Sequence, residues 1–438
     1  MTTTTTTTPS ASATEALADL VATTVIRAFT ALPRKYQPRE REWVPLSGVV
    51  LEDECGEMFC AALGTGMKVL PENKVPLAKG WVLHDCHAEV IAIRGFNCFL
   101  IEECRKLSHS KDSESYVSAY VQRSTSISPA QPQPFEIRPS IKIHFYSSEA
   151  PCGDCSMELL IASAADPTPW VPTVPAVPTP STPTTISSTL TSTAVPPHLR
   201  GRGYFSSLGA VRTKPGRADS PPTHSKSCSD KLSLRCCISL LLTPASLLLS
   251  PARAYIDTLV LPLAAYSTSG CARAFGAAET GRMAPLLGRE WGGGYKFAPF
   301  EVATTTREFA FSRRAGAGPN ACNLVAVKVA GRGEEVLIGG VLQGRKAFGG
   351  DVVGDREREK AGSMLCKARI WRAVVEVGVL LGAGAAGVLV NGGSGSYAQL
   401  KSASPERAVV KRDVRTALGA WIRTGGDDFS LPPLTPAT

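Results

Sequence analysis

Two short motifs in this chain carry side chains that suit zinc chemistry. His87 and Glu89 are separated by one residue, and Cys152 and Cys155 form a C-x-x-C pair within the run PCGDC. A catalytic zinc ion takes three protein ligands, such as imidazole nitrogen and thiolate sulfur, and leaves a fourth tetrahedral position to water. Zinc lowers the pKa of that water to about 7, and a nearby carboxylate such as Glu89 can then carry protons between water and substrate.

The elements expected around the motifs place both of them at helix starts. Apolar residues recur at helical spacing over residues 88–107, so His87 and Glu89 stand at the first turn of the strongest predicted helix. The cysteine pair lies between a predicted strand at 140–147 and a predicted helix at 156–165. Backbone N–H groups at a helix start favour the thiolate form that zinc requires.

H-x-E followed by P-C-x-x-C is the pattern of zinc nucleobase deaminases, in which a glutamate that does not bind the metal transfers protons. A lone C-x-x-C is less specific, because it also occurs in structural zinc sites and redox pairs. A four-cysteine zinc site needs a second C-x-x-C, which the chain lacks, and a redox pair needs a thioredoxin-like context, which is absent. Together the two motifs predict a hydrolytic deaminase.

Composition sets wider limits on the class of protein. The chain has 438 residues, a formal net charge of +9 and 13 cysteines. An apolar fraction of 43% is too high for a chain that is disordered throughout, and the positive charge favours a polyanionic partner. The first residues show no signal segment. We therefore expect an intracellular protein, of the nucleus or cytoplasm, with reduced cysteines and no membrane span.

The sequence predicts one folded domain with polar additions. We expect a disordered Thr-rich tail at 1–14, a single domain at 15–430 and a second tail at 431–438. Residues 166–197 carry nine prolines among Thr, Ser, Val and Ala, a composition that excludes helix and central strand. Because motifs with chemistry lie on both sides of this segment, we interpret it as a disordered insertion within the domain. Further helices are expected at 15–32 and in the basic segment 401–423, and strands at 43–52 and 58–63.

Five segments of the chain resemble the adenosine-to-inosine editing deaminases, and most closely the fungal members that act on tRNA. They are LGTGMK (63–68), HDCHAEVIAIRGF (84–96), SSEAPCGDCSMELL (147–160), RGRGYFSSLGAVRTKPGRADSPPTHSKSCSDKL (200–232) and LGAWI (418–422). The resemblance covers roughly residues 15–430. It implies an α/β, cytidine-deaminase-like mixed sheet flanked by helices, with an enlarged C-terminal half that forms an internal polyanion pocket.

The resemblance also implies which cysteines bind zinc. In ordinary cytidine deaminases both cysteines of P-C-x-x-C are ligands, whereas in the editing family the third ligand lies further on, in the S-C-S-D-K motif. The implied zinc ligands are therefore His87, Cys152 and Cys228. Glu89 becomes the catalytic proton carrier, and Cys155 becomes a nearby thiol that does not bind the metal.

A second cofactor, buried inositol hexakisphosphate, is implied by the same resemblance. Basic side chains inside a protein core need a polyanion to neutralise them. The residues carried over by motif are Arg94, Lys231, Lys367, Tyr397, Lys401, Lys411 and Trp421. Lys226 departs from the family pattern, because close relatives usually have an apolar residue directly before S-C-S-D-K.

Contacts with RNA are expected from residues 200–231, which carry seven basic residues against two acidic ones. Arg212, Lys214 and Arg217 alternate with Thr, Pro and Gly, which indicates a loop that docks an RNA backbone. Lys68 matches a position near the target nucleotide in relatives. The target base would be flipped out of its stack into the zinc pocket.

The expected reaction is hydrolytic deamination of adenosine to inosine in tRNA, and the resemblance implies a target beside the anticodon of an alanine tRNA. No DNA partner is expected. One alternative is deamination of messenger or double-stranded RNA, which needs a duplex-binding module for which the chain has no room. The other alternative is a catalytically inactive RNA-binding relative. Such a protein would have lost Glu89 or a zinc ligand, and all of these residues are present.

Overall fold

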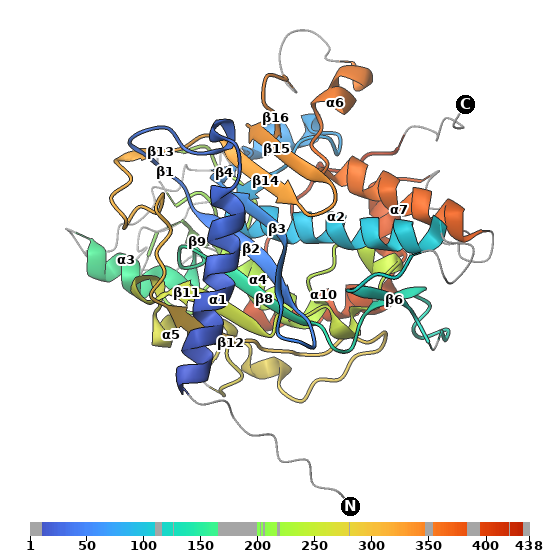
Figure 1. The fold of residues 1–438 in the computed structure, drawn as a ribbon, viewed down its shortest axis with the longest axis horizontal. Helices are drawn as coiled ribbons and strands as arrows, with labels where there is room; N and C mark the ends of the chain where they lie inside the picture. The colour runs from blue at the N-terminus through green and yellow to red at the C-terminus, as the bar shows by residue number, and fades with distance from the viewer. Residues whose placement is uncertain are drawn as a thin grey trace, which may run out of the picture.

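The computed structural model describes residues 11–109, 116–125, 127–164, 199–201, 203–204, 206–216, 220–279, 281–346, 354–382, 395–419 and 421–431. Its centre is an eight-stranded mixed sheet with the strand order β12-β11-β8-β2-β3-β14-β15-β16 (Figure 1). The strands are β2 (Leu46–Glu52), β3 (Met58–Thr65), β8 (Lys142–Ser147), β11 (Thr258–Pro262), β12 (Glu301–Thr305), β14 (Val325–Val329), β15 (Gly333–Ile338) and β16 (Val341–Leu342). The sheet confirms the expected α/β class.

The direction of the strands changes across the sheet. Strands β8, β11 and β12 are parallel neighbours, whereas β8, β2, β3, β14, β15 and β16 pair antiparallel in turn. Parallel neighbours need a long crossover connection. The connection from β8 to β11 spans residues 148–257 and carries two of the three predicted zinc ligands.

Two long helices cover the two faces of the sheet. Alternate residues of a strand point to opposite faces, so Val50 packs in one cluster with α1 (Ala11–Thr30), and Val49 packs in another with α2 (Ala88–His109). The packing of α2 on β3 is close, because a Cβ on Gly64 would lie 2.1 Å from a side-chain methyl of Ile91. This packing of α2 against the sheet holds the first turn of α2 in place.

The remaining elements surround this core. The helices are α3 (Met157–Ser163), α4 (Cys228–Ile238), α5 (Thr268–Phe275), α6 (Asp355–Ala361), α7 (Lys367–Leu381), α9 (Tyr397–Ser402) and α10 (Pro405–Leu418). Four two-stranded ribbons pair β1 (Glu42–Trp43) with β13 (Asn320–Ala321), β4 (Met67–Val69) with β5 (Asp85–His87), β6 (Val121–Arg123) with β7 (Phe135–Ile137), and β9 (Leu199–Arg200) with β10 (Arg212–Thr213).

Most expected elements are found, with shifted ends. The first helix begins at Ala11, inside the segment expected to be a tail, and the helix predicted at 401–423 is two helices separated near Pro405. The predicted insertion at 166–197 lies outside the described residues. Within the part of the chain that the structure describes, no helix has both the length and the apolar character needed to cross a membrane.

Candidate active site

The structure brings His87, Cys152 and Cys228 together. His87 is the last residue of β5, Cys152 follows β8, and Cys228 is the first residue of α4. The sulfur atoms of Cys152 and Cys228 lie 3.7 and 3.6 Å from His87 Nδ1, and the three ligand atoms lie within 4.8 Å of one another. These separations fit ligands around one tetrahedral ion with bonds of about 2.0–2.3 Å. The group could therefore hold a metal ion.

The two cysteine segments are bonded to each other. Ser229 donates its backbone N–H to the Cys152 carbonyl at 2.9 Å and its hydroxyl to the Pro151 carbonyl at 3.0 Å. Gly153 has a φ of +103°, and a Cβ there would lie 2.2 Å from the Ser227 hydroxyl oxygen. Only glycine allows this approach. The hydrogen bond between the two thiols lowers the pKa of Cys152, which favours the thiolate that a metal binds.

Cys155 lies apart from the His/Cys/Cys group. Its side chain is fully buried, and its sulfur lies 3.5 Å from the sulfur of Cys271 on α5. The hydrogen bond with Cys271 and burial raise the pKa of the Cys155 thiol, so it stays protonated. This placement agrees with the expectation that Cys155 is not a ligand.

Glu89 lies in the first turn of α2, two residues after His87, and is only 6% exposed. Burial raises the pKa of its carboxyl above the ordinary value, and the negative charge of Cys152 raises it further, while His87 and Lys214 lower it. A carboxyl with a raised pKa, held beside the metal group, can both accept and release a proton near neutral pH.

Asp85 links the metal group to the basic residues around it. Its carboxylate accepts hydrogen bonds from the His87 backbone N–H at 3.0 Å, the Ser225 hydroxyl at 2.6 Å and the Lys214 ammonium at 2.8 Å, and it forms an ion pair with Lys231. One buried carboxylate therefore binds two lysine ammonium groups, a serine hydroxyl and the backbone of His87.

Lys214 is part of this interior network and not of an RNA-binding surface. It is 3% exposed, and its ammonium lies 3.2 Å from the Cys228 sulfur. Burial alone would lower the pKa of Lys214, but Asp85 and the two cysteines raise it above the ordinary value. Its burial and its contact with Cys228 do not support the predicted RNA contact, which stays a prediction.

The structure does not support the predicted RNA contact of Arg212 either. Arg212 is 1% exposed, and its guanidinium donates to the carbonyls of Gly201, Gly203, Tyr204 and Ser207 at 2.8–3.0 Å. The side chain is therefore the internal support of the loop that was expected to dock RNA.

The other two predicted RNA contacts have different outcomes. Arg217 lies outside the described residues. Lys68 is exposed on β4, directly beside Met67, which pairs with His87 on β5. Lys68 is therefore an exposed cation near His87, and its contact with RNA stays a prediction.

Replacing Arg212 by methionine is expected to lower the free energy of unfolding by about 3–5 kcal/mol, since buried carbonyl oxygens lose charged donors. Urea denaturation measures this. The matched control is Arg253→Met, which removes an exposed arginine and should change stability by less than about 0.5 kcal/mol. Equal stabilities for the two variants would contradict the supporting role of Arg212.

A second cluster of side chains, which we call the basic pocket as a name for the group, is linked to the metal group through the ion pair of Lys231 with Asp85. Its members are basic residues of α2, α4, α7, α9 and α10: Arg94, Lys231, Arg235, Lys367, Lys401, Arg407 and Lys411. Burial lowers the pKa of Lys367 to about 8 despite its ion pair with Asp427, and lowers that of Arg235 to about 9. Burial, together with the positive charges of Arg407 and Arg235, lowers the pKa of Lys411 well below its ordinary value.

Few carboxylates balance the basic pocket. Among the described residues, its ion pairs come from Asp85, to Lys231, and from Asp427, to Lys367 and Lys401. The other cations donate to neutral oxygens: Arg94 to Leu365, Arg235 to Leu241, Arg407 to Ile238, and Lys411 to the Thr243 hydroxyl. Of the cations in the basic pocket, Arg407 is buried, Lys401 is exposed and the rest are partly buried. Desolvated cations without counter-charge are costly, so the donor set fits a polyanion.

Six of the seven residues predicted to bind an inositol phosphate belong to or border this pocket. Tyr397 borders it, because the ammonium groups of Lys401 and Lys367 lie 4.8 and 5.7 Å from its ring centre. The seventh, Trp421, instead lies against Lys226 and Arg415, each 5.8 Å from its ring centre.

Arg235 and Arg407 were missed by the sequence analysis. Arg235 follows Lys231 by four residues on α4, and Arg407 precedes Lys411 by four on α10. Residues at that spacing share a helix face. The spacing was therefore a usable signal.

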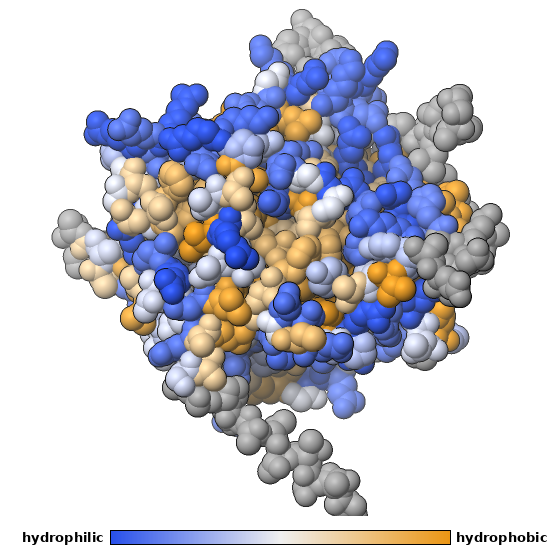
Figure 2. Space-filling view, viewed as in Figure 1, coloured by the Kyte–Doolittle hydropathy of each residue, from blue (hydrophilic) through white to orange (hydrophobic). Residues whose placement is uncertain are grey.

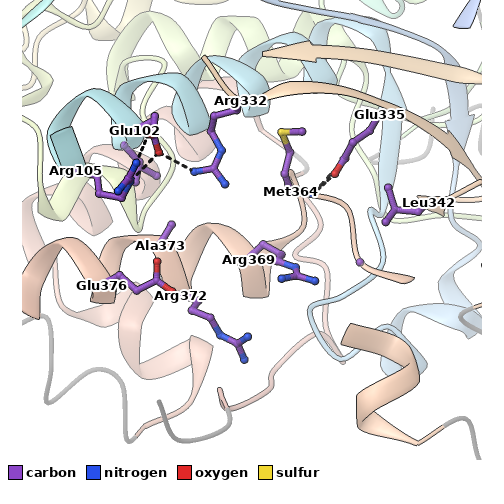
Figure 3. Close-up of a pocket in the computed structure, with 12 residues that line it drawn as sticks. Glu102, Arg105, Arg332, Glu335, Leu342, Met364, Arg369, Arg372, Ala373 and Glu376 are labelled. Atoms are coloured by element: carbon purple, nitrogen blue, oxygen red, sulfur yellow. Dashed lines mark hydrogen bonds and ion pairs between the residues drawn. The ribbon is translucent and has the colours of Figure 1, made fainter. Parts of the chain in front are cut away.

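A separate cavity of about 370 Å³ lies between the C-terminal half of α2 and α7 (Figure 3). Several of its charged side chains have partners: Glu102 pairs with Arg105 and Arg332, and Glu335 accepts from the Met364 N–H. The cavity is distinct from the metal group, and its ion pairs explain its charged lining. Figure 2 has the same view as Figure 1 and shows prominent hydrophilic residues at the right of the molecule, where α2 and α7 lie in Figure 1.

Comparison with known proteins supports the same interpretation. Residues 62–424 match the model of the adenosine-deaminase (editase) domain. The chain is 31% identical over 427 residues to tRNA-specific adenosine deaminase 1 of Schizosaccharomyces pombe, covering 94% of this chain and 96% of the relative. The protein of the same name from Saccharomyces cerevisiae is 30% identical over 50% of this chain and 52% of its own length. The double-stranded RNA-specific adenosine deaminase of Rattus norvegicus is 30% identical over only 31% of this chain and 11% of its own.

Proposed function

Since this chain belongs to the adenosine-deaminase (editase) family, we propose that it converts adenosine to inosine in tRNA with a zinc ion held by His87, Cys152 and Cys228. The observation that carries the proposal is the His/Cys/Cys group beside the buried carboxyl of Glu89. The family accounts for the reaction, and the donor set of one imidazole and two thiols accounts for the metal.

When bound, zinc would lower the pKa of a water molecule to about 7, so that hydroxide, the nucleophile that attacks carbon, would be available at neutral pH. Glu89 would take one proton from the attacking water and deliver it to the adenine ring nitrogen. It would then take the second proton from the hydroxyl newly bonded to the ring carbon and deliver it to the departing amine. Water and adenosine are consumed, and inosine and ammonia are formed. Lys214 remains protonated beside Cys228 and stabilises the negative charge of the thiolates, and Asp85 fixes both Lys214 and the His87 backbone.

We propose tRNA as the substrate over long duplex RNA, with the target beside the anticodon of an alanine tRNA. The relative that matches nearly the whole chain is named for tRNA, whereas the relative named for double-stranded RNA matches about a third of it. Lys68 is the proposed contact to a phosphate near the flipped base.

The substrate proposal is tested by comparing kcat/KM for transcribed alanine tRNA and for a long RNA duplex of mixed sequence. We expect the tRNA value to be at least about 100-fold higher, because a compact fold positions one unstacked base while a duplex must be opened. Lys68→Met should raise KM for the tRNA with little change in kcat. Preference for the duplex would contradict the proposal.

We further propose that the basic pocket holds inositol hexakisphosphate. The support is its excess of cations, most of them partly or fully buried, over carboxylates, and the lowered pKa values of Lys367, Arg235 and Lys411. Six phosphate groups on one small ring place many negative charges in a compact volume, which suits cations that converge from five helices.

Expression in a host that cannot make inositol hexakisphosphate is expected to yield little soluble protein, because the uncompensated cations of the basic pocket repel one another. Restoring the inositol polyphosphate kinases to the same host should restore soluble protein. Extraction with acid and mass spectrometry should then find about one inositol hexakisphosphate per chain. Equal soluble yields in the two hosts would contradict the proposal.

A further inference from the structure

Lys226 is a buried lysine that neither the zinc site nor the basic pocket accounts for. It precedes Ser227, the residue that caps α4, and it is 3% exposed. Its ammonium donates to the His224 carbonyl at 2.5 Å and lies 5.8 Å from the ring centre of Trp421. No carboxylate among the described residues forms an ion pair with it. Its burial also excludes direct contact with RNA in this conformation.

Arg415 meets the same ring from another element. Its guanidinium carbon lies 5.8 Å from the Trp421 ring centre, and its Nε is buried without a hydrogen-bond partner in the described part of the chain. Arg415 follows Lys411 by four residues on α10, so it extends the row of cations formed by Arg407 and Lys411. Lys226 and Arg415 therefore meet at one edge of the basic pocket.

Hydrogen bonds to a neighbouring strand hold the backbone at Lys226, and this limits the positions that the Lys226 ammonium can take. Lys226 forms a β-bridge with Thr213, and Ser227 donates its N–H to the Arg212 carbonyl at 2.8 Å. The charges of Lys231 and Arg415 both act on Lys226. Two cations against one indole ring repel each other, and the ring compensates only part of that cost.

We propose that Lys226 and Arg415 together bind one phosphate group of the polyanion in the basic pocket, with Trp421 as the wall of this added subsite. The inference rests on the proposed function only in assuming that the basic pocket holds inositol hexakisphosphate. A phosphate at this point neutralises both cations and supplies an acceptor for the unpartnered Nε of Arg415. The cation at position 226 then helps to retain the ligand at this edge of the basic pocket.

The test measures ligand retention in the intact protein. Wild type and variants are purified from a host that makes inositol hexakisphosphate and are held in urea just below the unfolding transition. The ligand that remains bound is extracted and quantified by mass spectrometry over time. Lys226→Met and Arg415→Met should each shorten the half-life of bound ligand about 10-fold, the effect of losing one charge-assisted hydrogen bond.

Two further variants make the result specific. Lys226→Arg keeps the charge and should retain the ligand as the wild type does. Lys296→Met removes a lysine that lies 5.6 Å from the Tyr255 ring, outside the basic pocket, and should also match the wild type. If Lys226→Met retains ligand as long as Lys296→Met does, the subsite is refuted. A wild type that carries no inositol phosphate would refute the polyanion itself, and loss of tRNA binding with unchanged retention would assign Lys226 to RNA instead.

Discussion

Glu89→Gln is expected to lower kcat for inosine formation by about 10²–10⁴-fold, the contribution typical of a general acid–base group. Glutamine keeps the shape of the side chain but can neither accept the proton of the attacking water nor release it to the departing amine. Zinc content should stay at the wild-type value, since Glu89 is not one of the three clustered ligands.

For the same substitution, the raised pKa of Glu89 predicts the direction in which the free energy of unfolding changes. The buried carboxyl of Glu89 has a raised pKa, so its charged form is unfavourable in the folded protein. A neutral amide removes that cost, and the free energy of unfolding should stay constant or rise. Activity would then fall without loss of folding, which separates a catalytic role from a structural one.

Glu102→Gln is the matched control, because Glu102 lies on the same helix and is also buried. It pairs with Arg105 and Arg332, far along α2 from the metal group, so its loss should lower stability by about 1–2 kcal/mol and leave kcat within about twofold. Single-turnover measurements with saturating enzyme report the chemical step directly. An undiminished rate for Glu89→Gln would contradict the assigned mechanism.

Cys228→Ala is expected to reduce zinc from about one ion per chain to nearly none and to abolish activity. A three-ligand site with an open fourth position loses most of its affinity when one thiolate is removed. The Lys214 ammonium, which lies 3.2 Å from the Cys228 sulfur, would also lose one of its negative neighbours.

Cys155→Ala is the matched control from the same C-x-x-C motif. Its sulfur contacts Cys271 and not the metal group, so zinc content should remain at about one per chain and activity within a few-fold of wild type. Metal analysis by mass spectrometry on protein purified without chelator distinguishes the two variants. Retention of zinc by Cys228→Ala with its loss from Cys155→Ala would overturn the ligand assignment.

The local motifs at the site could be predicted from the sequence because their chemistry depends on short spacing. The structure places His87, Cys152 and Cys228 together, as the family resemblance implied, although Cys228 is far away in sequence. The helix that carries Glu89 was also predicted, since its apolar periodicity is regular over many turns.

Burial could not be predicted from the basic residues themselves. Arg212 and Lys214 have the composition of an exposed RNA-binding loop, but both are interior. Lys214 pairs with Asp85, which is distant in sequence, and the Arg212 guanidinium donates to carbonyls of its own loop. A charge count along the sequence does not distinguish a cation that meets solvent from one that meets a buried carboxylate. Arg235 and Arg407 were missed although their four-residue spacing from Lys231 and Lys411 places them on the same helix faces.

The central claim, that this chain deaminates adenosine in tRNA, is tested most directly by locating inosine in treated tRNA. Purified protein is incubated with total tRNA from cells that lack this activity, and inosine is mapped by sequencing, where it is read as guanosine. We expect new inosine at one position beside the anticodon of alanine tRNA with wild type and none with Glu89→Gln. Absence of inosine with zinc-loaded wild type, or its formation by Glu89→Gln at the wild-type rate, would contradict the claim.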